Sequence, residues 1–280
     1  MKKSLLALSV ALCLASCSAS RRAIPVSNGL VEGPRPSENF KLGVAGYTYR
    51  QFSIDETLGS LRGMGAKYLS IKDFWLPLDS SEKTMADFKA KCASYDVDPY
   101  ILGPIYMRSE KDIDNAFAYV ARFGHKMFIG VPNYELLDYL TAKVAETGIR
   151  VAIHTHGPDN APFPNIKEVA DRVGDPSKGI GCCMDLGHSA RYGDNIIEDI
   201  YKYKEFIYDI HIKDETEASK AGKTWEIGRG VMDFKAIIIA LREIGYQGNI
   251  SIEFEKNANA PQTGVAESLG YLRAICDLTE

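Results

Sequence analysis

Short apolar segments alternate with longer amphipathic segments from residue 41 to the C-terminus. The short segments are rich in β-branched residues, as buried strands are, whereas apolar positions in the longer segments recur at helical spacing. The pattern predicts strands at 41–47, 66–71, 98–103, 125–131, 150–154, 179–185, 206–212 and 249–255. It predicts helices at 54–65, 80–95, 109–124, 133–148, 165–175, 194–204, 232–245 and 264–277.

Eight strand–helix pairs in series favour one α/β fold, a (β/α)8 barrel or TIM barrel. A doubly wound open sheet is the alternative, but no GxGxxG turn follows the first strand. In the last two strands Asp209, His211 and Lys213, and then Ser251 and Glu253, alternate with apolar residues. Because side chains alternate between the two faces of a strand, we expect these polar groups to line the barrel lumen.

Polar side chains that bind metals gather at the ends of the fifth to eighth strands. Four of the five histidines lie there, together with two acidic residues: His154, His156, His188, His211, Asp185 and Glu253. A single histidine at a strand end is more often a hydrogen-bonded structural residue. Four imidazoles and two carboxylates at the catalytic end of one barrel would repel each other or protons unless a cation neutralised them. The pattern therefore predicts a divalent metal site.

The stretches CCMDLGHSARYG, IHIKDE and GRGVMDFKAIIIALREIGYQGNISIEFE resemble the xylose-isomerase-like barrel superfamily. That superfamily, often labelled sugar phosphate isomerase/epimerase, includes ketose 3-epimerases, lyases that cleave 3-keto-glycosides and, more distantly, endonuclease IV. The resemblance covers nearly all of the chain after residue 40. It implies one metal ion held by His154, Asp185, His211 and Glu253, although His154 stands in VAIH where the epimerases have a glutamate.

The same resemblance implies roles in the reaction. In the epimerases the glutamates at the positions of His154 and Glu253 are the two acid/base groups, so a mechanism with two carboxylates is altered here. His188, in the DxGH motif, matches a substrate-binding histidine. His156 is expected beside His154, in contact with the substrate or supporting the metal ligand, and Arg191 is placed to meet a hydroxyl or acid group of the substrate.

Two lysines are candidates from position alone. Lys72 follows the second strand and could carry a proton or bind a substrate oxygen; a solvated loop lysine is the alternative. Lys213 shares the lumen face with His211, where it could bind substrate. A buried ammonium there would need Asp214, Glu255 or the substrate as its partner.

A site with two histidines and two carboxylates suits Mn²⁺, Co²⁺, Zn²⁺ or Mg²⁺. Such a site implies a sugar isomerase or epimerase that abstracts the proton next to a ketone and passes through an enediolate. Loss of a β-substituent after the same proton abstraction would instead make the protein a 3-keto-glycoside lyase or hydratase. A non-catalytic sugar-binding lipoprotein is the alternative of another class.

The N-terminus predicts export. Residues 1–17 have a basic start, an apolar stretch and an end, Leu14 to Cys17, that resembles a bacterial lipobox. We expect Cys17 to carry lipid, 18–40 to be a flexible tether and 41–280 to be a single barrel domain; an ordinary signal peptide is the alternative. The protein would then lie on a periplasm-facing membrane surface of a Gram-negative bacterium, held there by lipid alone. Because phosphorylated sugars are cytoplasmic, this location favours a free ketose or keto-glycoside.

Composition excludes little else. A net charge of -4 and a pI near 5.8 give no reason to expect a nucleic acid partner, against a role like that of endonuclease IV. Cys92, Cys182, Cys183 and Cys276 show no CxxC spacing. The adjacent Cys182 and Cys183 should point to opposite faces of their strand and are expected to be core residues rather than part of a disulfide or metal site. Subunit pairing through tyrosine-rich loops is left open.

Overall fold

The computed structural model describes residues 35–158 and 162–279. The predicted signal peptide, the lipidation residue Cys17 and most of the predicted tether lie outside the described residues. Residues 35–40 are described, and Pro36–Asn39 form a short 3-10 helix that is bonded to the C-terminal helix through the Ser37 N–H and Asp277 Oδ1, 2.8 Å apart.

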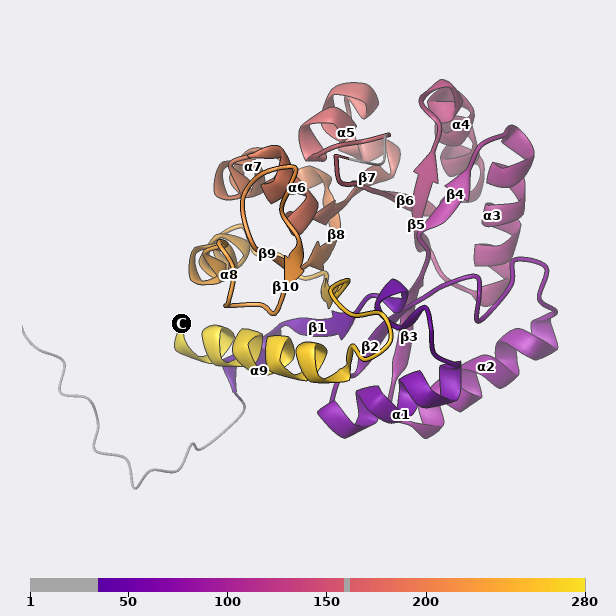
Figure 1. Ribbon diagram of the computed structural model, residues 1–280. Coiled ribbons are helices and arrows are strands. Elements are labelled where there is room, and N and C mark those ends of the chain that lie inside the picture. Colours follow the sequence, from indigo (N-terminus) through magenta and orange to yellow (C-terminus); the bar gives the residue numbers. More distant parts are fainter. Residues whose placement is uncertain (1–34, 159–161, 280) are drawn as a thin grey trace, which may run out of the picture. The chain divides into compact units, whose positions relative to one another are not determined.

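A parallel sheet forms a nearly closed barrel (Figure 1). Its order is β3-β2-β1-β11-β8-β7-β6-β5-β4, and every pairing is parallel. The strands are β1 Lys41–Val44, β2 Tyr68–Ile71, β3 Asp98–Leu102, β4 Ile105–Met107, β5 Met127–Pro132, β6 Arg150–His154, β7 Ile180–Asp185, β8 Ile207–Ile212 and β11 Asn249–Ile252. Since only Gly103 and Pro104 separate β3 from β4, the strands β3 and β4 are the two halves of one interrupted strand. Together they correspond to the third of the eight predicted strands, and they lie at the two ends of the sheet order.

Gly103 explains how the interrupted strand fits against its neighbour. Its φ is +120°, and a side chain there would collide with the carbonyl oxygen of Ile129 in β5. Glycine is the residue that accepts both this backbone conformation and so close an approach.

Helices surround the sheet (Figure 1). They are α1 Ile54–Met64, α2 Glu82–Ser94, α3 Glu110–Phe123, α4 Leu137–Thr147, α5 Ile166–Val173, α6 Leu186–Tyr192, α7 Ile196–Lys202, α8 Phe234–Glu243 and α9 Gln262–Leu278. The sequence marks their ends. Ser53 and Glu56 form a reciprocal capping box at the start of α1, and Gly65 ends it in the left-handed conformation.

The structure confirms the barrel and, besides the added strand β4 and a first strand that ends at Val44, departs from the expected elements in the following ways. The predicted helix 133–148 is a 3-10 turn, Tyr134–Leu136, followed by α4. The helix α6, immediately after β7, was not predicted. Its seven residues are too few to show helical periodicity, and Asp185 both ends the strand and caps the helix by accepting the His188 N–H at 2.9 Å. The two-residue strands β9 (Asp214–Glu215) and β10 (Thr224–Trp225) form an unexpected hairpin.

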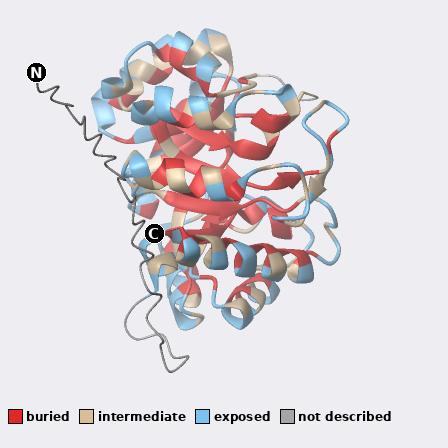
Figure 2. Cartoon of the chain, turned by 90° about the vertical axis from the view of Figure 1, so that its left-hand side faces the viewer, coloured by how far each residue is buried: buried red, intermediate tan, exposed pale blue. Residues whose placement is uncertain are grey.

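Buried apolar residues form two separate clusters. The larger core lies between sheet and helices, and a smaller cluster of Ile101, Ile129, Ala152 and Cys183 lies apart from it. Figure 2 shows the buried residues concentrated in the strands and on the helix faces turned toward them. Cys182 belongs to the larger core, so the adjacent cysteines point to opposite faces, as expected. All four cysteines of the described part are free and buried.

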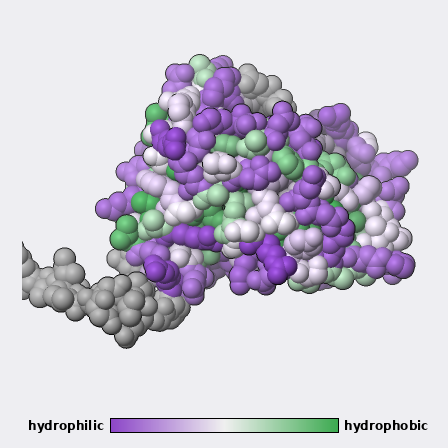
Figure 3. Space-filling view, turned by 60° about the horizontal axis from the view of Figure 1, so that its bottom comes forward, coloured by the Kyte–Doolittle hydropathy of each residue, from purple (hydrophilic) through white to green (hydrophobic). Residues whose placement is uncertain are grey.

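The surface is mostly hydrophilic on the face drawn in Figure 3, with apolar side chains scattered between polar ones. In the part of the chain that the structure describes, no helix has the length and apolar character needed to span a bilayer.

Candidate active site

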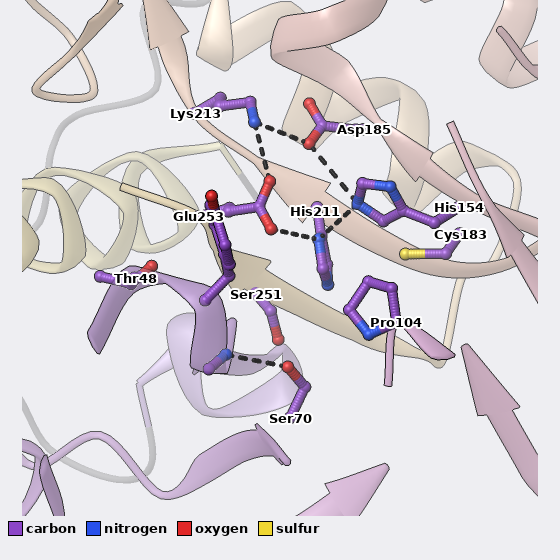
Figure 4. Close-up of polar contacts among 12 residues, drawn as sticks. Thr48, Ser70, Pro104, His154, Cys183, Asp185, His211, Lys213, Ser251 and Glu253 are labelled. Atoms are coloured by element: carbon purple, nitrogen blue, oxygen red, sulfur yellow. Dashed lines mark hydrogen bonds and ion pairs between the residues drawn. The ribbon is translucent and has the colours of Figure 1, made fainter. Parts of the chain in front are cut away.

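Four side chains from consecutive strand ends converge in the lumen. His154 ends β6, Asp185 ends β7, His211 lies in β8 and Glu253 directly follows β11. All four are buried. In Figure 4 they point toward one another. The structure therefore brings together the four residues that the sequence proposed as metal ligands.

The spacing of their polar atoms suits one divalent cation. His154 Nε2 lies 2.9 Å from His211 Nδ1 and 3.8 Å from Asp185 Oδ2, and His211 Nδ1 lies 3.3 Å from Glu253 Oε1. Bonds of about 2.0–2.2 Å would place neighbouring ligand atoms about 2.8–3.6 Å apart, so these separations are at or close to those around a single ion.

The protonation states of His154 and Glu253 and one unsatisfied oxygen of Asp185 agree with that fit. Burial, helped by His211 and His156, holds the pKa of His154 well below its usual 6.5, which leaves a neutral imidazole with a lone pair. Burial works to raise the pKa of Glu253, but Lys213 and His211 outweigh it and hold this pKa well below 4.5. Within the described residues Asp185 Oδ2 accepts no hydrogen bond of good geometry. This donor set fits a divalent cation.

Lys213 is fully buried beside the four residues. Its ammonium lies 2.9 Å from Asp185 Oδ2, 2.8 Å from Glu253 Oε2 and 2.5 Å from Glu255 Oε1. Of the partners considered from the sequence, Glu255 is correct and Asp214 is wrong.

Asp214 has a different task. Its carboxylate accepts the backbone N–H groups of Gly228, Gly230 and Met232, at 2.7–3.2 Å, and so secures the loop before α8. It faces away from Lys213 because alternate residues point to opposite sides of the chain.

A pocket of about 600 Å³ opens above the cluster. His154 and Glu253 reach its floor, and the exposed aromatic residues Tyr47, Phe74 and Tyr106 contribute to its lining. Its size accommodates a sugar with a further substituent, within the range of small-molecule sites.

The other residues proposed from the sequence lie around this pocket. His156 pairs with Tyr106 through Nε2 and the tyrosine hydroxyl, 3.1 Å apart, and His188 Nε2 lies 3.1 Å from Lys213 Nζ. Arg191, in α6, lines the pocket and donates to the carbonyl of Lys220 at 3.0 Å.

Lys72 is buried in the pocket wall rather than solvated. Its ammonium donates to the Pro104 carbonyl at 2.5 Å and lies 3.3 Å from Asp73. The alternative of a solvated loop lysine is therefore wrong, and the side chain is held where it faces the pocket.

Glu215 lines the pocket and was not among the predicted residues. It is buried, and within the described residues its Oε2 atom has no hydrogen-bond partner. Burial raises its pKa to about 7, although Lys213 and Arg191 act to lower it. Extending the alternation of Asp209, His211 and Lys213 by one more step would have pointed to this residue.

Comparison with known proteins identifies the family to which this barrel belongs. The model of the family described as xylose isomerase-like TIM barrel matches residues 133–275, which include all four converging residues. The chain belongs to this family. An inosose dehydratase of Geobacillus thermodenitrificans (strain NG80-2) is 28% identical to this chain over 161 residues. The match covers 51% of this chain and 53% of the dehydratase, so it spans about half the length of that relative.

Solved structures share the fold. A protein from Parabacteroides distasonis ATCC 8503 is 23% identical, with a TM-score of 0.65 over 84% of this chain and 99% of its own. The 3-keto-D-glucoside 4-epimerase YcjR from E. coli is 17% identical, with a TM-score of 0.66 over 84% and 99%. A D-psicose 3-epimerase from Clostridium cellulolyticum H10 is 15% identical, with a TM-score of 0.66 over 85% and 100%.

Proposed function

We propose that this protein is a metal-dependent sugar isomerase or epimerase that abstracts the proton next to a ketone. The observation that carries the proposal is the convergence of His154, Asp185, His211 and Glu253 at the floor of a pocket, at separations suited to one cation. The names of similar proteins, a dehydratase and two epimerases, support it.

A bound Mn²⁺, Co²⁺, Zn²⁺ or Mg²⁺ supplies Lewis acidity, which polarises a substrate carbonyl and makes the neighbouring C–H more acidic. The chain supplies the proton transfers. Glu253 is ionised and can accept a proton. Glu215, whose pKa is about 7, is present in both protonation states near neutral pH, as an efficient acid or base must be. His154 stands where the epimerases have their second acid/base glutamate. In this proposal Glu215 supplies the carboxyl group that is missing at that position.

A lyase or hydratase is the second candidate. The same proton abstraction, followed by loss of a β-substituent, eliminates water or an alcohol from a ketone. The relative that is 28% identical is a dehydratase, which favours this outcome. The aromatic residues of the pocket lining would suit the extra substituent of a 3-keto-glycoside.

Exchange in D₂O tests both candidates. The metal-loaded protein is incubated with free ketoses and 3-keto-glycosides, and NMR follows deuterium at carbon. We expect deuterium next to the ketone, with an epimer or isomer as the product of the first activity and a cleaved or dehydrated product of the second. Glu253→Gln should abolish exchange. Sugar binding without exchange for every substrate would instead indicate a non-catalytic sugar-binding lipoprotein.

We also propose, from the sequence alone, that the enzyme is exported and lipid-anchored through Cys17. Cys17→Ser should move the full chain from the membrane to the soluble fraction. Unchanged membrane fractionation of this variant would reject lipidation at that residue.

A further inference from the structure

The ammonium of Lys213 occupies a position of unusual chemistry. Besides its three carboxylate contacts it lies 3.1 Å from Nε2 of His188. The side chain is only 1% exposed. Four residues of the types that bind metals thus surround one amino group: His188, Asp185, Glu253 and Glu255.

Three of these residues form a second group suited to a metal ion. Ligand atoms of His188, Glu253 and Glu255 lie within 4.8 Å of one another, as do those of the first group. The two groups share Glu253. Its Oε1 atom faces His211 of the first group, and its Oε2 atom faces Lys213. A carboxylate that presents one oxygen to each of two adjacent positions has the arrangement of a bridging ligand in two-metal sites.

The charge of the surrounding carboxylates explains why a metal ion or an ammonium group must lie in the second group, beside Glu253 Oε2. Asp185, Glu253 and Glu255 are too close together to be ionised at once without compensation. One divalent cation at the first position leaves a negative charge that a single ammonium can balance.

The stem of Lys213 is also held in place. A side chain at Gly187, in α6, would collide with Cγ of Lys213 and come within 3.0 Å of Glu215 Oε1. Because α6 packs its backbone directly against the lysine, the ammonium is confined among the carboxylates.

We propose that the Lys213 ammonium takes the place of a second divalent cation, so that the native centre holds one ion and loss of this side chain converts it to a two-ion centre. The inference rests on the proposed metal-dependent function, since the first ion must bind. It separates this enzyme from two-metal hydrolases of phosphate esters, in which both ions stabilise the attacking and leaving oxygens.

The test counts ions. The full chain, Lys213→Ala and Lys72→Ala are equilibrated with Mn²⁺, freed of excess and analysed for manganese per chain. Lys72 is the matched control, a buried lysine of the same pocket that lies beside a carbonyl and one aspartate. We expect one ion for the wild type and Lys72→Ala, and two for Lys213→Ala. Two Mn²⁺ ions that share a carboxylate should also show a magnetically coupled EPR spectrum.

A double variant identifies the second position. Adding Glu255→Gln to Lys213→Ala should return the count to one, because Glu255 belongs to the second group only. If Lys213→Ala unfolds without metal, Mn²⁺ should restore folding with two ions bound; failure to refold would contradict the proposal.

The outcomes separate the two proposals. A wild type that binds no ion overturns the proposed function and this inference together. A wild type with one ion and a folded Lys213→Ala that still holds one overturns only this inference, and so does a wild type with two.

Discussion

Two polar layers of the barrel differ although three strand segments, β7, β8 and the β11 segment, contribute to both. The lower layer consists of Tyr100, Cys183, Asp209 and Ser251, and the upper layer consists of His154, Asp185, His211 and Glu253. On β7, on β8 and along the β11 segment, the upper residue comes two positions after the lower one, so both point the same way.

The lower layer satisfies its own hydrogen bonds. The Tyr100 hydroxyl lies 2.8 Å from Ser251 Oγ and 3.2 Å from Asp209 Oδ2, and the Cys183 thiol donates to Asp209 Oδ2 at 3.5 Å. Burial raises the pKa of Asp209 to about 7. This arrangement is that of a structural polar network, in which buried groups are paired with one another.

The polar atoms of the upper layer do not all find hydrogen-bond partners within that layer. Among the described residues, Asp185 Oδ2 accepts no hydrogen bond of good geometry, and the ligand atoms His154 Nε2, His211 Nδ1 and Glu253 Oε1 crowd together at 2.9–3.3 Å in the buried lumen. Buried polar atoms without partners are uncommon and call for an explanation such as an ion or a ligand. The comparison teaches that hydrogen-bond satisfaction, more than residue type, distinguishes a functional layer from a structural one.

The largest expected effect comes from removing an upper-layer ligand. Asp185→Ala or His211→Ala should remove bound metal and lower turnover by at least about 10³-fold, because the metal contributes several kcal/mol of charge stabilisation. Metal analysis, kinetics and circular dichroism would be measured together. A variant that keeps full activity with no metal bound would show that the upper layer is structural as well.

Glu215→Gln should have the next largest effect, lowering turnover by roughly 10²–10⁴-fold, the usual contribution of a general acid or base. In the wild type, activity that needs protonated Glu215 should fall as the pH rises through about 7. The variant should lose this dependence.

The pH dependence of the free energy of unfolding offers an independent comparison of the wild type with Glu215→Gln. The folded protein keeps the Glu215 proton that the unfolded chain releases above its ordinary pKa of 4.5, so the free energy of unfolding should fall between about pH 4.5 and 7. In metal-free protein Glu215→Gln should make this fall smaller. If the wild type and Glu215→Gln have the same pH profile of stability and the same pH profile of turnover, Glu215 takes no part in the reaction.

The smallest catalytic effect is expected in the lower layer. Tyr100→Phe removes the hydrogen bonds that the tyrosine hydroxyl makes with Asp209 and Ser251 and should reduce the free energy of unfolding by about 1–3 kcal/mol. Metal content and turnover should stay close to those of the wild type. Denaturant unfolding and kinetics measure the two effects. A loss of turnover comparable to that of Asp185→Ala would erase the difference between the layers.

The sequence was sufficient for the barrel and for the position of the converging residues, because strand periodicity determines which side chains face the lumen. It could not predict the partners of Lys213, since acidic neighbours on both sides of the chain were available and only packing decides between Asp214 and Glu255. It also missed α6, because Asp185 serves both the strand and the helix cap. Glu215 was missed because β8 ends before it, although the alternation continues.

The most direct test of the central claim is a crystal structure of the protein with Mn²⁺, using anomalous scattering to locate the ion. We predict one peak in the upper layer, about 2.0–2.2 Å from His154 Nε2, Asp185 Oδ2, His211 Nδ1 and Glu253 Oε1. An upper layer without a peak, at a Mn²⁺ concentration that supports activity, would contradict the account.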